Sequence, residues 1–237
     1  SGNALAYPEL SIIVVSYNTR DMTLECLASV YEQTTTPFEI IVVDNDSTDG
    51  SAPAIAEQFP DVHLLAETTN HGFAPAHNVA MPHCRGDWIL LLNPDTVVLD
   101  GALDKLLAFA KRRPEAKIWG GRTLFGDGSL NTTSCWRKMS LWTVFCRVTG
   151  LTGIFSRSAV FNAEEYAGWD SEFNELIEGT PRNFHLADVV FPIDRFFQLT
   201  GNDPKSWNSN YTYSYVYIIL DILHASHEIT TKLLKAF

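Results

Sequence analysis

Short apolar strand patterns alternate with helical patterns through the first half of the chain. The strand patterns are β-branched or leucine-rich runs, found at residues 10–16, 39–44, 62–65 and 88–92. Each is followed by apolar residues at helical spacing, over residues 21–33, 51–59, 74–83 and 99–113. Continuous apolar strands are typical of parallel sheets, because crossover helices cover both of their faces. The alternation predicts an α/β fold with a mostly parallel sheet and helices on both faces.

This regularity fades after about Gly121, and from Gly168 onward the pattern is weak and interrupted by Asn, Asp and Pro. A length of 237 residues suits one large domain, or two small units fused around one core. We therefore expect a single fused domain with two halves, residues 1–120 and residues 121–237. The first half carries the βα units, and the second half completes a site.

Polar residues follow each of the four predicted strands. They occupy residues 16–18, 44–50, 69–74 and 93–96. Ordinary turn chemistry explains any one of these groups. In an open parallel sheet, however, ligands bind beyond the carboxyl ends of the strands. Four polar strand ends together therefore predict a binding site at one edge of the sheet.

Charge and missing motifs exclude several classes of protein. The 17 basic residues stand against 28 acidic ones, a net charge of -11, which argues against a nucleic-acid partner. The chain has no Gly-x-Gly-x-x-Gly after its first strand, no P-loop lysine motif and no Gly-x-Ser-x-Gly elbow. An anionic ligand would thus have to be met by backbone amides, a metal ion or a few placed arginines.

Cysteine usage and hydropathy bear on the compartment. The four cysteines are far apart and form no Cys-x-x-Cys pair, which favours a reduced, cytoplasmic protein over a disulfide or zinc scaffold. The N-terminal residues lack the features of a signal peptide. The longest apolar stretch, residues 211–223, is too short to cross a bilayer.

The strand-end sequences, taken in order, resemble those of family 2 glycosyltransferases of the GT-A fold. The matching runs are Ser-Ile-Ile-Val-Val-Ser-Tyr-Asn (11–18), Glu-Ile-Ile-Val-Val-Asp-Asn-Asp-Ser-Thr-Asp-Gly-Ser (39–51), Asn-His-Gly-Phe-Ala (70–74) and Leu-Leu-Leu-Asn-Pro-Asp-Thr (90–96). The resemblance covers residues 10–170. It is nearest to the rhamnosyltransferase-like branch, which builds bacterial surface polysaccharides.

The resemblance implies a Rossmann-like GT-A domain that transfers a sugar with inversion. The donor would be a dTDP- or UDP-linked sugar, with rhamnose suggested by the family branch. The acceptor would be the hydroxyl of a glycan or lipid-linked glycan, reached from the cytoplasm at the inner face of the membrane. Residues 1–120 would then bind the nucleotide sugar, and residues 121–237 would lie on the acceptor side. A catalytically impaired sugar-nucleotide-binding module is the alternative; a nucleotidyltransferase would show a basic Gly-rich loop early in the chain, which is missing.

The resemblance also implies which residues contact the nucleotide. Asp44 matches the acidic residue that accepts a hydrogen bond from a uracil or thymine ring NH. Asp46 lies in the turn that follows, and neighbouring Asp49 could equally cap the helix that begins at Ser51. The full set of expected contacts is Ser16, Tyr17, Asn18, Asp44, Asp46, Asn70, Gly72, Phe73 and Asn78.

The Asn93-Pro94-Asp95 sequence occupies the position of the family's metal motif, usually Asp-x-Asp. A pyrophosphate leaving group carries charge that Mg²⁺ or Mn²⁺ neutralises through oxygen ligands. The resemblance therefore implies that Asp95 holds the metal, while Asn93 supplies a neutral carbonyl. The alternative is an ordinary turn between a strand and a helix.

The chain departs from the family after about residue 170. The expected Gly-Gly-Phe-Asp turn and the Glu-Asp pair, whose aspartate serves as general base, are not found. Asp188 and Asp194 are candidate bases, with ordinary surface or turn acids as the alternative. The spacing of Glu172, Glu175 and Glu178 predicts a solvated helical face.

The sequence alone allows two interpretations of His77 and of one aromatic segment. His77 could donate to the diphosphate or be a solvated surface histidine. The aromatic segment from Trp136 to Phe145, flanked by Arg137, Lys138 and Arg147, could touch lipid or a lipid-linked acceptor. Packing of this segment against the sheet is the simpler expectation.

Overall fold

The computed structural model describes residues 7–114, 118–121, 123–129, 135–137, 141–155, 158, 160–161, 173–176, 182–184 and 189–192. The helices are α1 (Arg20–Gln33), α2 (Ser51–Gln58), α3 (Phe73–Ala80), a 3₁₀ turn η1 (Met81–His83), α4 (Ala102–Arg112), α5 (Leu141–Val148) and α6 (Leu151–Ile154). The strands are β1 (Leu10–Ser16), β2 (Phe38–Asn45), β3 (His63–Glu67), β4 (Trp88–Leu92), β5 (Ile118–Gly121), β6 (Cys135–Arg137), β7 (Phe173–Leu176), β8 (Arg182–Phe184) and β9 (Val189–Pro192).

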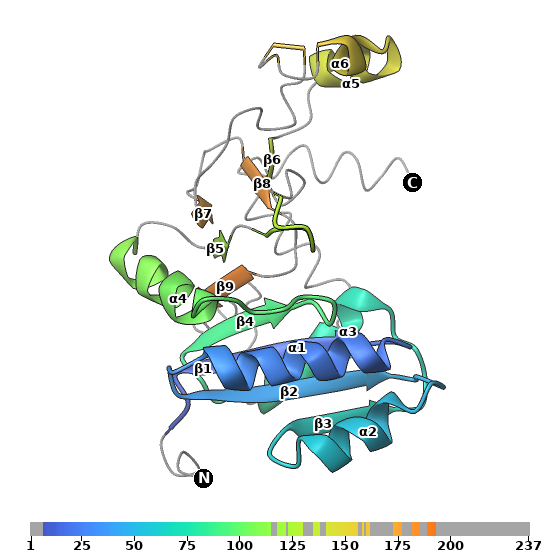
Figure 1. Ribbon diagram of the computed structural model, residues 1–237, viewed down its shortest axis with the longest axis vertical. Coiled ribbons are helices and arrows are strands. Elements are labelled where there is room, and N and C mark those ends of the chain that lie inside the picture. The colour runs from blue at the N-terminus through green and yellow to red at the C-terminus, as the bar shows by residue number, and fades with distance from the viewer. Residues whose placement is uncertain are drawn as a thin grey trace.

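Seven of these strands form one sheet, in the order β3-β2-β1-β4-β9-β5-β7 (Figure 1). Strands β3, β2, β1 and β4 are parallel to one another, as predicted from their apolar runs. Strand β9 is antiparallel to both of its neighbours, β4 and β5, and β7 is antiparallel to β5. The α/β class with a mostly parallel sheet is confirmed.

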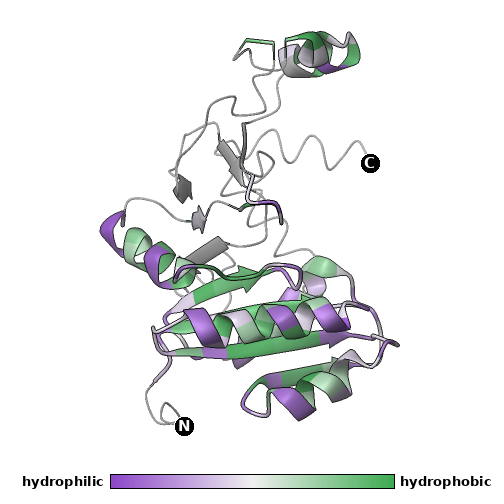
Figure 2. Ribbon diagram, in the orientation of Figure 1, coloured by the Kyte–Doolittle hydropathy of each residue, from purple (hydrophilic) through white to green (hydrophobic). Residues whose placement is uncertain are grey.

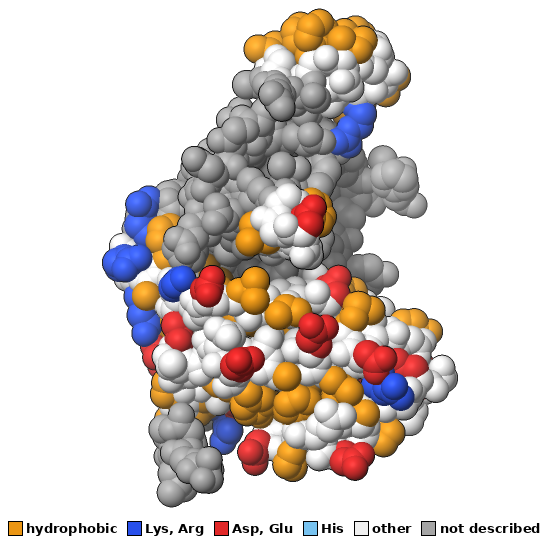
Figure 3. All heavy atoms as spheres, in the orientation of Figure 1, with side chains coloured by type: hydrophobic (Ala, Val, Ile, Leu, Met, Phe, Trp, Pro, Cys, Tyr) orange, Lys and Arg blue, Asp and Glu red, His pale blue; other side chains and the backbone are white. Residues whose placement is uncertain are grey.

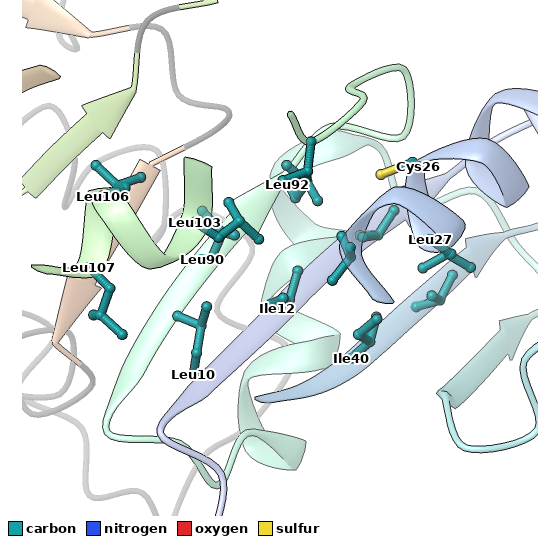
Figure 4. Packing of buried hydrophobic residues seen from close by; sticks show 14 of the residues in the cluster. Leu10, Ile12, Cys26, Leu27, Ile40, Leu90, Leu92, Leu103, Leu106 and Leu107 are labelled. Atoms are coloured by element: carbon teal, nitrogen blue, oxygen red, sulfur yellow. The ribbon is translucent and has the colours of Figure 1, made fainter. Parts of the chain in front are cut away.

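The two faces of the sheet are covered by different helices. Alternate strand residues such as Ile12, Val14 and Ile40 pack with α1, α2 and α4 in one buried cluster (Figure 4). Helix α3 contacts β1 and β2 from the other face. The four parallel strands are mostly hydrophobic with polar ends, and α1 and α4 carry both hydrophobic and hydrophilic residues (Figure 2). Each fully buried aliphatic side chain contributes roughly 1.5–3 kcal/mol, so this double burial stabilises the strand ends that carry the candidate site.

The later part of the chain contributes strands to the same sheet. Strand β9 lies between β4 and β5, where Leu91 pairs with Val189 and Trp88 pairs with Pro192. Residues 173–176 form β7, so the helical face predicted from the acidic spacing is wrong at Glu175. Glu172 and Glu178 lie outside the described residues.

Helices α5 and α6 pack on each other, away from the sheet (Figure 1). Leu141, Phe145 and Val148 of α5 are exposed, so the expected packing of this segment against the sheet is wrong for α5. In the described ranges, no helix is both long enough and apolar enough to cross a membrane.

Candidate functional site

The polar strand ends meet at one edge of the sheet, as predicted. Ser16 at the end of β1 pairs in register with Asp44 of β2, and Asp44 pairs with Ala66 of β3. Val14 of β1 pairs with Leu92, the last residue of β4. The parallel register therefore brings the loops after β1, β2, β3 and β4 together.

Hydrogen bonds join the loop after β1 to the loop after β2. Asn18 accepts from the Thr48 amide through Oδ1 at 2.8 Å, and its own amide donates to Ser47 Oγ at 2.9 Å. Asn18 and Asp46 both have left-handed backbones, with φ of 53° and 69°. Asn and Asp tolerate this conformation better than other non-glycine residues, which explains the residue types at these turns.

The Asp49 side chain accepts hydrogen bonds from the first residues of two helices, α1 and α2. Its carboxylate accepts from the Ser51 hydroxyl and amide at 2.5 and 3.0 Å, and from the Arg20 amide at 2.9 Å. The hydrogen bond from the Ser51 hydroxyl is the main cause that lowers the pKa of Asp49. Asp49 thus anchors the first turns of α1 and α2, in agreement with the capping alternative.

Asn45 ties the end of β2 to the loop before α3. Its side chain is buried, and Nδ2 donates to Asn70 Oδ1 at 2.9 Å and to the Gly72 carbonyl at 3.3 Å. Its Oδ1 accepts from the His71 amide at 2.9 Å. Asn45 is not among the contacts expected from the sequence, although its position directly after Asp44 at a strand end could have indicated it.

Asp44 is a buried carboxylate with spare hydrogen-bonding capacity. Its side chain is only 3% exposed, and within the described part of the chain Oδ1 has no hydrogen-bond partner. A buried acceptor left unpaired costs about 1–3 kcal/mol. At the edge where the four loops meet, this oxygen can accept a hydrogen bond from a ligand.

The turn after β4 carries an exposed carboxylate that forms no interaction with another described residue. Asp95 is exposed, and no hydrogen bond or ion pair joins its carboxylate to another described residue. The backbone carbonyl of Asn93 accepts from the Thr96 amide at 3.2 Å. An exposed carboxylate beside an amide oxygen suits a hard divalent cation.

The described ranges contain no cluster of three or more His, Cys, Asp or Glu side chains that could hold a metal alone. Mg²⁺ is commonly bound by one or two carboxylates, with water and substrate phosphates completing its shell. The residues at 93 and 95 fit that kind of shared site rather than an all-protein cage.

The other predicted contacts divide into exposed and buried groups. Tyr17 and Phe73 have roughly half-exposed rings, and Asn70 and Gly72 are also exposed. Ser16 is fully buried, and its hydroxyl lies 3.1 Å from those of Thr19 and Thr23. Asn78 is buried on α3 and not in the preceding loop. The exposed members can meet a ligand directly, whereas the buried members support the loops.

His77 differs from both expectations for it. It is buried on α3, where Nδ1 bonds the Phe73 carbonyl at 2.8 Å. Burial lowers the pKa of His77 to about 4, so the imidazole is neutral at physiological pH. The expectation of a solvated surface histidine is wrong, and a neutral buried ring offers no charge to a diphosphate.

An open hollow of about 310 Å³ lies beside the first turn of α1. Asn18, Arg20 and Asp49 are among its lining residues, and neither Asp44 nor Asp95 lines it. It therefore adjoins the linked loops without containing the two carboxylates that carry the candidate chemistry.

The candidate bases Asp188 and Asp194 lie outside the described residues. Strand β9, which falls between them in sequence, is described. It begins at Val189 opposite Leu91, at the end of β4 that leads into Asn93, and it ends at Pro192 opposite Trp88, at the other end. The chain thus enters β9 at the edge that carries the candidate site.

The chain is similar in sequence to known glycosyltransferases. The model of Glycosyl transferase family 2 matches residues 11–164. The chain is 30% identical over 132 residues to the N-acetylglucosaminyl-diphospho-decaprenol L-rhamnosyltransferase of Mycobacterium tuberculosis, covering 51% of the chain and 43% of that relative. It is 36% identical over 127 residues to the O-antigen biosynthesis protein RfbC of Myxococcus xanthus, covering 52% of the chain and 10% of that relative.

Among solved structures, the mannosyltransferase PcManGT of Pyrobaculum calidifontis, in complex with GDP-Man and Mn²⁺, is 29% identical with a TM-score of 0.45. The match covers 51% of this chain and 37% of that one. The chain spans less than half the length of each of these proteins. The family match spans well over half of the chain itself, and the chain therefore belongs to glycosyltransferase family 2.

Proposed function

We propose that the chain transfers a sugar from a nucleotide diphosphate sugar to the hydroxyl of a glycan or lipid-linked glycan, in the synthesis of a bacterial polysaccharide. The observation that carries this proposal is the buried Asp44 carboxylate, whose Oδ1 has no described partner at the edge where four loops meet. Family membership supplies the reaction class. The acceptor class follows the names of the relatives from M. tuberculosis and M. xanthus.

Asp44 favours a uracil or thymine base in the donor. An ionised carboxylate only accepts hydrogen bonds, and both bases carry a ring NH that donates. Cytosine has no ring NH and could donate to Asp44 only through its exocyclic amine, at a different position on the ring. Tyr17 is half-exposed in the loop after β1 and can pack against the base or ribose. We therefore propose a UDP- or dTDP-linked donor, with rhamnose as the sugar because of the M. tuberculosis relative.

The diphosphate of the donor would be met at the turn after β4. Asp95 and the side-chain carbonyl of Asn93 would hold Mg²⁺ or Mn²⁺, which supplies positive charge to the leaving diphosphate. The protein itself is acidic, with a net charge of -11, so its overall charge does not attract phosphates. Asp95 suits this role because no described group competes for its carboxylate.

The acceptor needs a general base, and we propose Asp188 in preference to Asp194. Asp188 precedes β9, which begins at the site edge, whereas Asp194 follows the end of β9 opposite Trp88. In the inverting reaction, the carboxylate takes the proton of the acceptor hydroxyl. The acceptor oxygen bonds to the anomeric carbon as the bond from that carbon to the diphosphate oxygen breaks.

A reducing compartment is part of the proposal. The described cysteines Cys26, Cys84 and Cys146 are thiols. Burial, with Glu39 nearby, raises the pKa of Cys84 to about 12, so this thiol is inert. Inert thiols suit a cytoplasmic protein that meets its nucleotide-linked donor at the site of donor synthesis.

Calorimetric titration with UDP and dTDP tests the Asp44 assignment. We expect Asp44→Asn to weaken binding at least tenfold, because one acceptor oxygen becomes an NH₂ donor facing the base NH. The control is Asp61→Asn, an exposed acid in the turn after α2 with the same loss of charge. Equal affinity in wild type and Asp44→Asn would refute this use of Asp44. Nucleotide binding without any release of nucleoside diphosphate from the sugar donor would favour an impaired binding module instead.

A further inference from the structure

Helices α5 and α6 and the residues that follow them carry a continuous exposed apolar surface, here called the apolar cap. Leu141 and Val148 are 91% and 81% exposed. The cap is seen in orange at the top of the space-filling view (Figure 3). Its exposed members are Leu141, Trp142, Val144, Phe145, Val148, Ile154, Phe155 and Val160.

The cap is internally organised. The Trp142 indole donates to the Val160 carbonyl at 2.8 Å and stacks on Phe145 at 5.6 Å between ring centroids. The Phe155 ring lies 4.9 Å from that of Phe161, and Cys146 is fully buried. These contacts hold the two helices and the following turn as one unit, so the outward face is fixed by the fold.

The exposed residues of α5 follow helical spacing. Leu141, Val144, Phe145 and Val148 lie at positions i, i+3, i+4 and i+7, which is one stripe along the helix. A globular protein normally turns such a stripe toward its core. Here the stripe faces away from the sheet, and the exposed Arg147, three residues after Val144, lies at its edge. Exposed apolar surface of this extent marks an interaction site.

The segment of sequence that contains the cap has a net charge opposite in sign to that of the whole chain. Residues 128–163 contain Arg137, Lys138, Arg147 and Arg157 but no Asp or Glu, whereas the whole chain carries -11. Blue basic surface lies just below the cap in Figure 3. An apolar stripe with aromatic residues and a basic residue on the same helix is typical of helices that lie in the interface of an anionic bilayer.

We propose that the apolar cap docks on the surface of an anionic phospholipid membrane, with the α5 stripe inserted among the lipid headgroups and Arg147 beside it. The cap makes a shallow contact in the plane of the interface. Docking of two copies through this face would bring like charges together, which disfavours a second copy as the partner. The proposal rests on exposure and charge, and it holds whether or not the chain transfers sugar.

Flotation with lipid vesicles tests the proposal in the absence of nucleotide. Wild-type protein should float with vesicles of 30% phosphatidylglycerol and 70% phosphatidylcholine. Val148→Glu should lower the partition coefficient at least tenfold, because it places a carboxylate on the inserted stripe. The matched control is Tyr7→Glu, which changes the charge equally at a residue that is 70% exposed and lies just before β1. The control should float within twofold of wild type.

A second variant separates charge from insertion. Arg147→Gln should weaken binding to the anionic vesicles about fivefold, which corresponds to ~1 kcal/mol per cation at such a surface. It should leave weak binding to pure phosphatidylcholine unchanged. Absence of wild-type flotation, or equal flotation of Val148→Glu and wild type, would overturn the proposal. A dimer in sedimentation that Val148→Glu dissociates, without vesicle binding, would identify the cap as a contact between copies and would equally overturn it.

Discussion

The side-chain amide of Asn45 donates to Asn70 Oδ1 across 2.9 Å and so joins the end of β2 to the loop before α3. The same Asn70 oxygen accepts from the Gly72 amide at 2.8 Å. Gly72 has φ of 81°, in the region where glycine is favoured, and α3 begins at the next residue. The buried Asn45 therefore sets the position of the loop that carries Asn70 and Gly72, two of the expected nucleotide contacts.

Asn45→Ala should lower both stability and nucleotide affinity. The substitution leaves the His71 amide and the Gly72 carbonyl without their partner, which costs about 1–3 kcal/mol in the free energy of unfolding. Urea denaturation measures that loss. Calorimetry with UDP or dTDP should show weaker binding, because the loop is no longer fixed before the ligand arrives.

A double-mutant cycle with Asn70→Ala is the control. If the pair acts as one unit, the double variant should lose less stability than the sum of the two single losses, by roughly 0.5 kcal/mol or more. Strictly additive losses would mean that the 2.9 Å contact contributes nothing of its own.

His77 should make the protein less stable as the pH falls below neutrality. Its pKa in the folded protein is lowered to about 4, compared with 6.5 for the free side chain. The unfolded chain therefore binds an additional proton between these two pH values, and the stability that His77 contributes at pH 7 is lost as the pH falls from 6.5 toward 4. The loss amounts to as much as about 3 kcal/mol.

Comparison of unfolding free energies at pH 7 and pH 4.5 measures this effect. His77→Asn keeps a donor for the Phe73 carbonyl and removes the titrating group, so its difference between the two pH values should be smaller than that of wild type. The exposed His63, changed to Asn, serves as the matched control and should behave as wild type does. Parallel losses in wild type and His77→Asn would contradict the neutral, buried state.

Asp188→Asn should lower turnover about 100-fold or more, because general-base catalysis contributes factors of that size. Nucleotide affinity should stay within twofold of wild type, since the base acts on the acceptor. Asp194→Asn makes the same chemical change beyond the other end of β9 and should keep most of the activity. Release of nucleoside diphosphate from the sugar donor reports both. Loss of turnover in Asp194→Asn alone would reverse the assignment.

Much of the fold was predictable because burial on both faces leaves a clear pattern. The runs at residues 10–16 and 39–44 have continuous apolar centres, residues 12–15 and 40–43, and both form parallel strands with nearly the predicted bounds. Polar residues follow the carboxyl end of each strand. Because the strands are parallel, the sequence predicts that these residues lie at one edge of the sheet. The fusion of two halves near residue 120 stays a prediction.

The remaining features depend on contacts that sequence does not specify. Nothing local distinguishes a buried His77 from a solvated one, because its burial comes from α3 packing on β1 and β2. The apolar spacing of α5 predicts an amphipathic helix but not that its apolar stripe faces outward. Asn45 bonds to residues that lie 25 to 27 positions later in the sequence. Such contacts depend on the register of β2 and β3, which the sequence does not reveal.

Calorimetric titration of UDP and dTDP with and without Mn²⁺ tests most directly whether the edge of the sheet is a nucleotide-sugar site. The variants are Asp95→Ala, after β4, and Asp87→Ala, an exposed acid immediately before β4. Mn²⁺ should strengthen binding of at least one of the two nucleotides at least tenfold in wild type and in Asp87→Ala, and should have no effect in Asp95→Ala. Failure of both nucleotides to bind at millimolar concentration, or an equal effect of Mn²⁺ in Asp95→Ala, would contradict the proposed site.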